Sequence, residues 1–124
     1  FPKTRRATPK IMAKLSKEFK GAKFVCAHFG GMYMWEDVLS YLAGQSVYLD
    51  TSMCAGYMDR ELAVRIVNKH GADNILYGSD LPWGGAKENI DFVQQFRLST
   101  SDTEKILGQN ALRILKESGY AIQE

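Results

Sequence analysis

The sequence contains few cysteines and no long apolar run, and both absences narrow its class. Only 2 of the 124 residues are cysteine, too few for the disulfide framework that stabilises many small secreted domains. Cys26 lies in an apolar run, the usual setting of a buried free thiol, and we expect both it and Cys54 to be free. No stretch of about 18 apolar residues occurs, and the polar, basic N-terminal segment lacks the core of a signal peptide. These features predict a soluble, cytoplasmic protein.

Acidic side chains are scarce near the N-terminus, although the net charge of the whole chain is only +2. Such an excess of basic residues forms either a nucleic-acid surface or a solvated helix face. The repeated aromatic residues on which bases stack are missing, so we expect the helix face, with no nucleic-acid partner and no membrane partner. Glu18 is the only acid among the basic residues Lys3, Arg5, Arg6, Lys10, Lys14, Lys17, Lys20 and Lys23.

The rest of the composition suits one globular domain, because 45% of the residues are hydrophobic and no linker or low-complexity segment interrupts the chain. The first residue is Phe1 rather than Met, so we expect the chain to begin inside a longer gene product. The first helix is predicted to start at the cap residue Thr8 and to end before Gly21. Its apolar stripe consists of Ile11, Met12, Leu15 and Phe19.

Helices and short apolar strands alternate along the remainder of the chain. We predict strands over Lys23–His28, Ser46–Ser52 and Asn74–Tyr77. Helical spacing predicts a helix over Trp35–Leu42, one over Asp59–His70, a third around Ile90–Phe96, and a last helix that starts at a Ser101–Glu104 capping box and ends at Gly119. The order αβαβαβαα, with strands that start every 20 to 30 residues, requires right-handed crossovers and therefore a parallel sheet.

Functional side chains of parallel α/β folds gather in the loops that follow the strands, and three polar clusters occur there. His28 precedes Gly30, whose freedom allows a sharp turn, and is either an acid/base group or a histidine held by a neighbouring carbonyl. Asp80 ends an apolar strand, where a carboxylate needs a metal, a positive partner or backbone N–H groups. It is therefore either a metal ligand or an Asx-type cap of the turn at Pro82.

The strand order bears on which of these side chains binds metal and which acts as an acid or base. If the three strands lie side by side in sequence order, His28 and Asp80 are two strands apart, about 10 Å between strand axes. That separation favours Asp80 as a metal ligand and His28 as an acid/base group facing the substrate. Asp50 either bonds a substrate in the pocket, orients a neighbouring group or forms a turn, and Trp83 is assigned to the pocket wall. Two further residues are interpreted as structural: Trp35 in the core, and His70 at a helix C-terminus, where the dipole favours the imidazolium form.

The sequence contains four distinctive blocks, in this order and spacing: AHFGGMYMW, VYLDTS, ILYGSDLPW and ILGQNALRIL. Together they resemble the amidohydrolase-related (amidohydrolase 2) family of metal-dependent hydrolases and decarboxylases, and the resemblance runs from about Thr8 to Leu115. It implies that the whole chain, residues 1–124, is a single partial domain: the C-terminal part of a (β/α)8 TIM barrel, with strands six to eight. His28 then resembles the strand-six histidine that acts on substrate or water, Asp80 the metal-binding aspartate of strand eight, and Asn110 a packing residue of the last helix.

The resemblance also implies an activity and the groups that it needs. The implied enzyme is a metal-dependent hydrolase of a small carboxylate, lactone or amide, with zinc or a similar divalent ion. A non-oxidative decarboxylase and a non-catalytic α/β binding module are the alternatives. The family's metal-binding pair on strand one and the histidine that ends strand five have no counterpart in this sequence. We therefore expect the chain to associate with the missing N-terminal half or with copies of itself.

Overall fold

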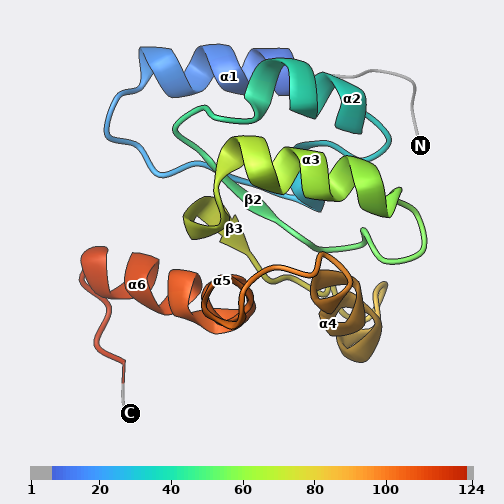
Figure 1. Ribbon diagram of the computed structural model, residues 1–124. Coiled ribbons are helices and arrows are strands. Elements are labelled where there is room, and N and C mark those ends of the chain that lie inside the picture. The colour runs from blue at the N-terminus through green and yellow to red at the C-terminus, as the bar shows by residue number, and fades with distance from the viewer. Residues whose placement is uncertain (1–6, 123–124) are drawn as a thin grey trace.

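A computed structural model describes residues 7–122, and within them three short strands form one parallel sheet (Figure 1). The strands are β1 (Val25–Cys26), β2 (Tyr48–Asp50) and β3 (Ile75–Leu76), in the order β1-β2-β3. Both pairings are parallel, as predicted from the spacing of the elements. Each strand is shorter than its predicted apolar run, in part because the backbone turns left-handed soon after β1 and β2, at His28 and Met53. The basic residues Lys3, Arg5 and Arg6 lie outside the described part of the chain.

The helices begin largely where capping chemistry predicts. The side chain of Thr8 accepts a hydrogen bond from the Ile11 N–H at 3.3 Å, and that of Asp59 accepts one from Leu62 at 2.9 Å. The helical segments are α1 (Pro9–Glu18), η1 (His28–Gly30), α2 (Trp35–Asp37), the π-turn η2 (Val38–Leu42), α3 (Arg60–His70), η3 (Ala72–Asn74), α4 (Ala86–Gln94), α5 (Thr100–Glu104), the π-turn η4 (Lys105–Gln109) and α6 (Asn110–Glu117). In the described residues, no helix has the length and apolar character needed to cross a membrane.

The start of α5 differs from the prediction by two residues. The cap is Ser99, whose hydroxyl oxygen accepts from the Asp102 N–H at 3.1 Å, and not Ser101. Ser99 has the extended backbone that a cap requires, with ψ of 155°, whereas Ser101 already lies within the helix. The error arose because each serine in this segment is followed three residues later by an acid, so spacing alone gave the cap two possible positions.

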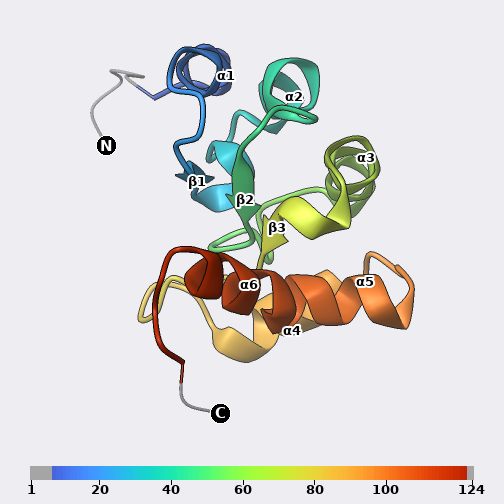
Figure 2. The same ribbon diagram turned by 90° about the vertical axis from the view of Figure 1, so that its left-hand side faces the viewer.

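Helices α1, α2 and α3 form a row along the outer side of the strands, and α4 to α6 follow beyond β3 (Figure 2). The strand register places Cys26, Leu49 and Ile75 on one face of the sheet, where all three are buried in the core. The predicted apolar stripe of α1 is only partly buried: Ile11 is 41% exposed and Phe19 58%. The buried residues of α1 are small ones, among them Ala13 and Ser16.

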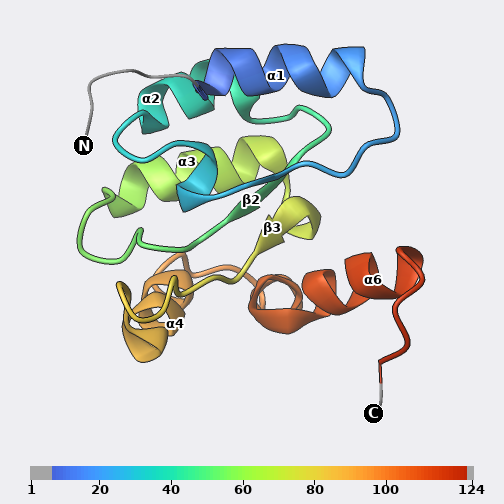
Figure 3. The ribbon, with the colours of Figure 1, turned by 180° about the vertical axis from the view of Figure 1, so that it is seen from behind.

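Both edges of the sheet are open within residues 7–122. β1 and β3 each pair only with β2 there, and Val25 on β1 is 51% exposed. α1 and α6 lie at opposite ends of this arrangement (Figure 3). The described residues therefore form an arc of strands with helices on its outer side, and not a closed structure.

The last helical segments hold β3 in place. Asn110, only 2% exposed, donates from Nδ2 to the carbonyls of Ala72 at 2.7 Å and Ile75 at 2.8 Å. Just past the strand, the Tyr77 N–H donates to the Ile106 carbonyl at 2.9 Å. Backbone groups at both ends of this edge strand thus find partners on η4 and α6. Asn110 has the structural role that its resemblance implied.

His70 also has the structural role predicted for it, but not the predicted charge. It is 6% exposed; its Nδ1 accepts from the Gly44 N–H at 3.0 Å, and its Nε2 donates to the Val47 carbonyl at 3.0 Å. Burial lowers the pKa of His70, because removal from water disfavours the charged ring. The expected imidazolium is therefore wrong: desolvation outweighs the helix dipole, and Nδ1 is needed as an acceptor.

Acid should destabilise the protein through His70. An unfolded histidine has a pKa of about 6.5, and the folded value is lower, so below about pH 6.5 the unfolded state binds the proton more readily. The contribution of His70 to stability is complete above that pH and is lost as the pH falls toward the folded pKa. We expect urea unfolding to show a decline in stability from pH 7.5 to 5.5 that is smaller in His70→Gln. An equal decline in both proteins would contradict this assignment.

Candidate active site at the carboxyl ends of the strands

The loops that follow the three strands contain most of the strained backbone of the described chain. In residues 7–122, six non-glycine residues have positive φ. Five of them lie in these loops: His28, Phe29 and Tyr33 after β1, Met53 after β2, and Asp80 after β3. Each such conformation costs on the order of 1 kcal/mol or more, and residues of this kind gather at functional sites. The strain therefore marks the same edge of the sheet that the polar clusters indicated.

The turn that carries His28 is left-handed over three consecutive residues. His28, Phe29 and Gly30 have φ of 56°, 54° and 89°. Phe29 is completely buried, with its ring centroid 6.2 Å from that of Phe96, so the turn is anchored in the core. From the other side, Trp35 donates from Nε1 to the His28 carbonyl at 3.0 Å and is itself 7% exposed, as expected for a core residue. His28 thus lies on a fixed piece of backbone.

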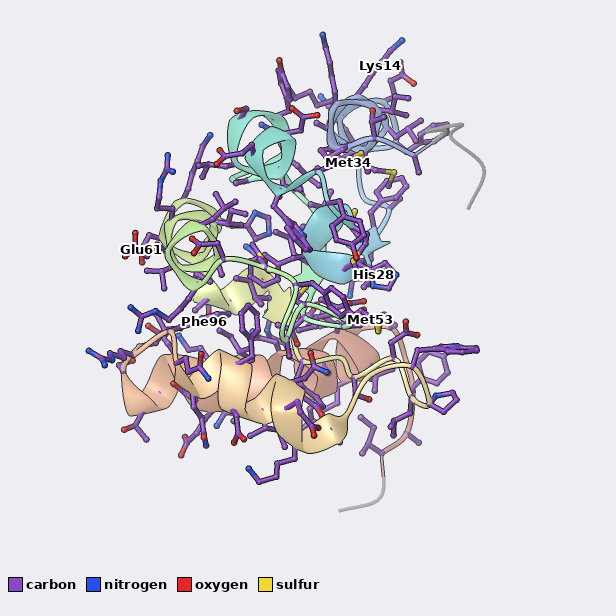
Figure 4. The ribbon with its side chains drawn as sticks, turned by 90° about the vertical axis from the view of Figure 1, so that its right-hand side faces the viewer. Lys14, His28, Met34, Met53, Glu61 and Phe96 are labelled. Carbon is purple, nitrogen blue, oxygen red and sulfur yellow. The ribbon has the colours of Figure 1, made fainter. Side chains whose placement is uncertain are left out.

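Asp50 ties the His28 turn to the end of β2. Its Oδ1 accepts hydrogen bonds from the His28 N–H at 3.2 Å, from the Ser52 N–H at 2.9 Å and from the Ser52 hydroxyl. The bond to the Ser52 N–H is an Asx-type turn, so turn chemistry and the orientation of a neighbour, considered separately in the sequence, are both present. In Figure 4 His28 lies near Met53, the residue that follows Ser52.

The His28 ring is held at one nitrogen. Nδ1 lies 3.2 Å from the Ser52 carbonyl oxygen and 3.2 Å from the Ser52 hydroxyl oxygen. Among residues 7–122, all hydrogen bonds of the ring involve Nδ1 and none involves Nε2. The two interpretations of His28 are thus compatible, because one nitrogen contacts a carbonyl while the other is available for chemistry. Ser52 was not singled out in the sequence, and its position two residues after Asp50 was the available signal.

The third loop is joined to the second through Gly78 and Thr51. The Gly78 N–H donates to the Thr51 hydroxyl at 3.1 Å, and that hydroxyl lies 3.2 Å from the Gly78 carbonyl, to which it donates. A Cβ on Gly78 would lie 3.2 Å from the Ser52 Cβ and 3.3 Å from Asp50 Oδ1. Glycine at this position therefore allows the loop after β3 to approach the carboxylate that holds His28.

Asp80 lies farther from its strand than the sequence suggested. β3 ends at Leu76, and Asp80 is exposed in the following loop. Its backbone carbonyl closes the turn by accepting from Trp83 at 2.8 Å and Gly84 at 3.1 Å, so the turn does not use the carboxylate that an Asx-type cap would use. The argument from burial is thus wrong for Asp80, because the loop brings its side chain into water. Trp83, expected in the pocket wall, is 78% exposed.

Two hollows on the surface of residues 7–122 are not lined by the predicted catalytic pair, His28 and Asp80. A hollow of about 260 Å³ beside the His28 turn is lined by residues that include Tyr33, Trp35 and Leu62, but not by His28, Asp50 or Asp80.

A metal ion does not find enough ligands in the described residues. No group of three or more His, Cys, Asp or Glu side chains in residues 7–122 could hold one. Asp80 alone offers one carboxylate, whereas zinc sites in proteins use three or four side chains. Cys26 and Cys54 are free, as predicted, and buried. Burial and the nearby Asp50 carboxylate raise the pKa of Cys26 to about 11 and also raise that of Cys54, so both remain neutral thiols.

Comparison with known families identifies one match along the sequence. A family model described as amidohydrolase matches residues 2–116. No protein of curated function matches the chain.

Several solved structures have a similar fold. An amidohydrolase from Burkholderia multivorans with bound zinc superimposes with a TM-score of 0.70 at 16% identity, over 85% of this chain and 48% of its own. A TIM-barrel protein from Bordetella bronchiseptica gives 0.70 at 21% identity, over 90% and 40%. A dihydroxybenzoic acid decarboxylase from Polaromonas, with bound manganese and the inhibitor 2-nitroresorcinol, gives 0.63 at 22% identity, over 87% and 38%. The chain thus spans less than half the length of these proteins, and its parallel sheet and helices match part of their barrels.

Proposed function

The chain belongs to the amidohydrolase family, and we propose that it forms the C-terminal part of a (β/α)8 barrel, with β1, β2 and β3 as strands six to eight. The parallel strand order, the helices on the outer side and the two open edges support this placement. So does the length of the chain, which covers 38% to 48% of the similar structures. In this proposal, strands outside residues 7–122, or a second copy of the chain, pair with β1 and β3.

The proposed activity is that of a metal-dependent hydrolase acting on a small carboxylate, lactone or amide. The observation that carries it is the His28 turn: strained, anchored by Phe29 and Trp35, and fixed at Nδ1 only. A histidine held in this way presents Nε2 to a substrate with little reorganisation, as a general acid or base requires. His28 would take a proton from the attacking water and deliver one to the leaving group.

Asp80 is proposed as one ligand of a divalent ion, which we expect to be zinc. The similar structures named above include one with bound zinc and one with bound manganese, which supports a divalent ion in general. Because residues 7–122 provide no further cluster of ligands, the remaining ones would lie elsewhere in the protein. The exposure of Asp80 agrees with a ligand that faces a site completed by other segments.

Decarboxylation is the second candidate. It is supported by the similarity to the dihydroxybenzoic acid decarboxylase, which at 22% identity concerns the fold alone. A decarboxylase needs a proton donor for the carbon that loses its carboxylate, and His28 with a proton on Nε2 would fill that role. The described residues of the site fit both reactions, so the products must distinguish them.

Metal content and product analysis test the proposal. We expect the full-length gene product to bind a divalent metal, and Asp80→Ala to lose most of it, because one of a small number of ligands is removed. Asp37→Ala, which removes an exposed acid from α2, is the matched control and should keep the metal. Incubation with lactones, amides and dihydroxybenzoates would show whether acid or carbon dioxide is released. Full metal content in Asp80→Ala would refute the ligand assignment.

A further inference from the structure

The hydrogen bonds around His28 have only one consistent arrangement of protons. A backbone carbonyl has no proton to donate, so the contact between His28 Nδ1 and the Ser52 carbonyl at 3.2 Å is a hydrogen bond only if Nδ1 carries the proton. In the neutral ring, the other nitrogen, Nε2, then has a lone pair and accepts. The carbonyl of Ser52 therefore favours one of the two tautomers of His28.

The Ser52 hydroxyl could favour either tautomer, because it both donates and accepts. It lies 3.2 Å from the same Nδ1. If its proton pointed at Nδ1, that nitrogen would have to be the acceptor, and the proton of the ring would move to Nε2. The direction of one hydroxyl proton thus decides whether Ser52 supports or opposes its own carbonyl.

Asp50 determines that direction. Its Oδ1 is a close hydrogen-bond partner of the Ser52 hydroxyl, and a carboxylate only accepts, so the hydroxyl proton points at Asp50. The oxygen of Ser52 is then left to accept, from Nδ1 and from the His28 N–H at 3.4 Å. The same Oδ1 accepts hydrogen bonds from the backbone N–H groups of His28 and Ser52, which fixes Asp50, Ser52 and His28 relative to one another.

We propose that Asp50 is a positioning residue that fixes the tautomer of His28 by holding the proton of the Ser52 hydroxyl. The pair leaves His28 Nε2 unprotonated and able to accept a proton from a substrate or from water. The use of that nitrogen rests on the proposed function of His28; the tautomer itself does not. The Ser52 side chain has little room to move away from Asp50 and His28, since it is 6% exposed and its Cβ faces Gly78.

The tautomer can be measured without any substrate. In full-length protein labelled with ¹⁵N in histidine, at alkaline pH where imidazole is neutral, the nitrogen chemical shifts distinguish a protonated from an unprotonated ring nitrogen. The signals of His28 are those lost in His28→Asn. In the wild type we expect Nδ1 to carry the proton. A wild-type ring protonated at Nε2 would overturn the proposal.

Two variants test the mechanism. In Asp50→Asn, the neutral amide oxygen is a weaker acceptor that is already shared by two backbone N–H groups, so the Ser52 hydroxyl turns toward Nδ1. We expect a substantial population of the Nε2-protonated tautomer. Adding Ser52→Ala removes that competing proton, and the Ser52 position keeps its carbonyl, so the double variant should return to the Nδ1-protonated form.

The controls separate positioning from a loss of folding and from a failure of the proposed function. Asp59→Asn removes the charge of another aspartate that accepts a backbone N–H but does not contact His28, and it should leave the tautomer unchanged. An unchanged tautomer in Asp50→Asn, or no return in the double variant, would overturn the proposal. If His28→Asn instead retained full turnover, the proposed acid/base role would fail while the tautomer result stood.

Discussion

Replacing His28 by alanine should lower kcat by about 10²–10⁴-fold, the usual contribution of a general acid or base, while the protein keeps its bound metal. Among residues 7–122 the ring is held only at Nδ1, which leaves Nε2 for proton transfer. In the proposed division of roles, Asp80 and not His28 binds the metal. Removal of the ring therefore affects proton transfer and not metal binding. Turnover and metal content, measured on the same preparation, provide the test.

The chain offers its own control for this experiment. His70 is its other histidine, and both of its ring nitrogens are engaged in structural hydrogen bonds away from the loops of the site. We expect His70→Gln to retain kcat and to lose stability. Loss of metal from His28→Ala would show that His28 is a ligand and would contradict the division of roles between His28 and Asp80.

Replacing Gly30 by alanine should destabilise the protein by roughly 2–4 kcal/mol, since backbone strain adds to overpacking. Gly30 has φ of 89°, a conformation that L side chains rarely adopt. A Cβ there would lie 2.9 Å from the Leu42 side chain and 3.0 Å from that of Leu49, both of which are completely buried. Both atoms are terminal methyl groups of core residues, so the core must rearrange to make room for the added Cβ.

Gly21 separates the two causes. It also has φ of 89°, but no atom lies within 4 Å of the position of its Cβ. Gly21→Ala therefore introduces backbone strain alone, about 1–2 kcal/mol. Urea unfolding of both variants should show the larger loss for Gly30→Ala. Similar losses would mean that the core around the His28 turn can relax and that the turn is less rigid than its contacts indicate.

The architecture was predictable because its signals are local. Short apolar runs between helical segments located the three strands, and the length of the crossovers required them to be parallel. Thr8 and Asp59 identified helix starts because the cap and the N–H it accepts from are three residues apart. Strand lengths were overestimated, since pairing depends on partners elsewhere in the chain and ends where the backbone turns, as at His28.

The candidate site was predictable in its members and less so in its geometry. His28 and Asp50 were identified from their positions after strands, but the contacts of Ser52 with a ring 24 residues away depend on the packing of two loops. The exposure of Asp80 depends on a turn closed by its carbonyl, and the neutral state of His70 on burial and on the carbonyl of Val47. Apart from the spacing of Ser52 from Asp50, none of these contacts leaves a pattern in the adjacent sequence.

The attachment of β3 to the final helical segments has a consequence for synthesis on the ribosome. Chain growth delivers Asp80 well before the carbonyls of Ala72 and Ile75 can meet the Asn110 amide, or the Tyr77 N–H the Ile106 carbonyl. The loop that carries Asp80 thus emerges on an edge strand whose backbone still lacks these partners. A nascent chain that stops before Ile106 would leave β3 without these hydrogen bonds, so this part of the site is assembled only after η4 and α6 have been synthesised.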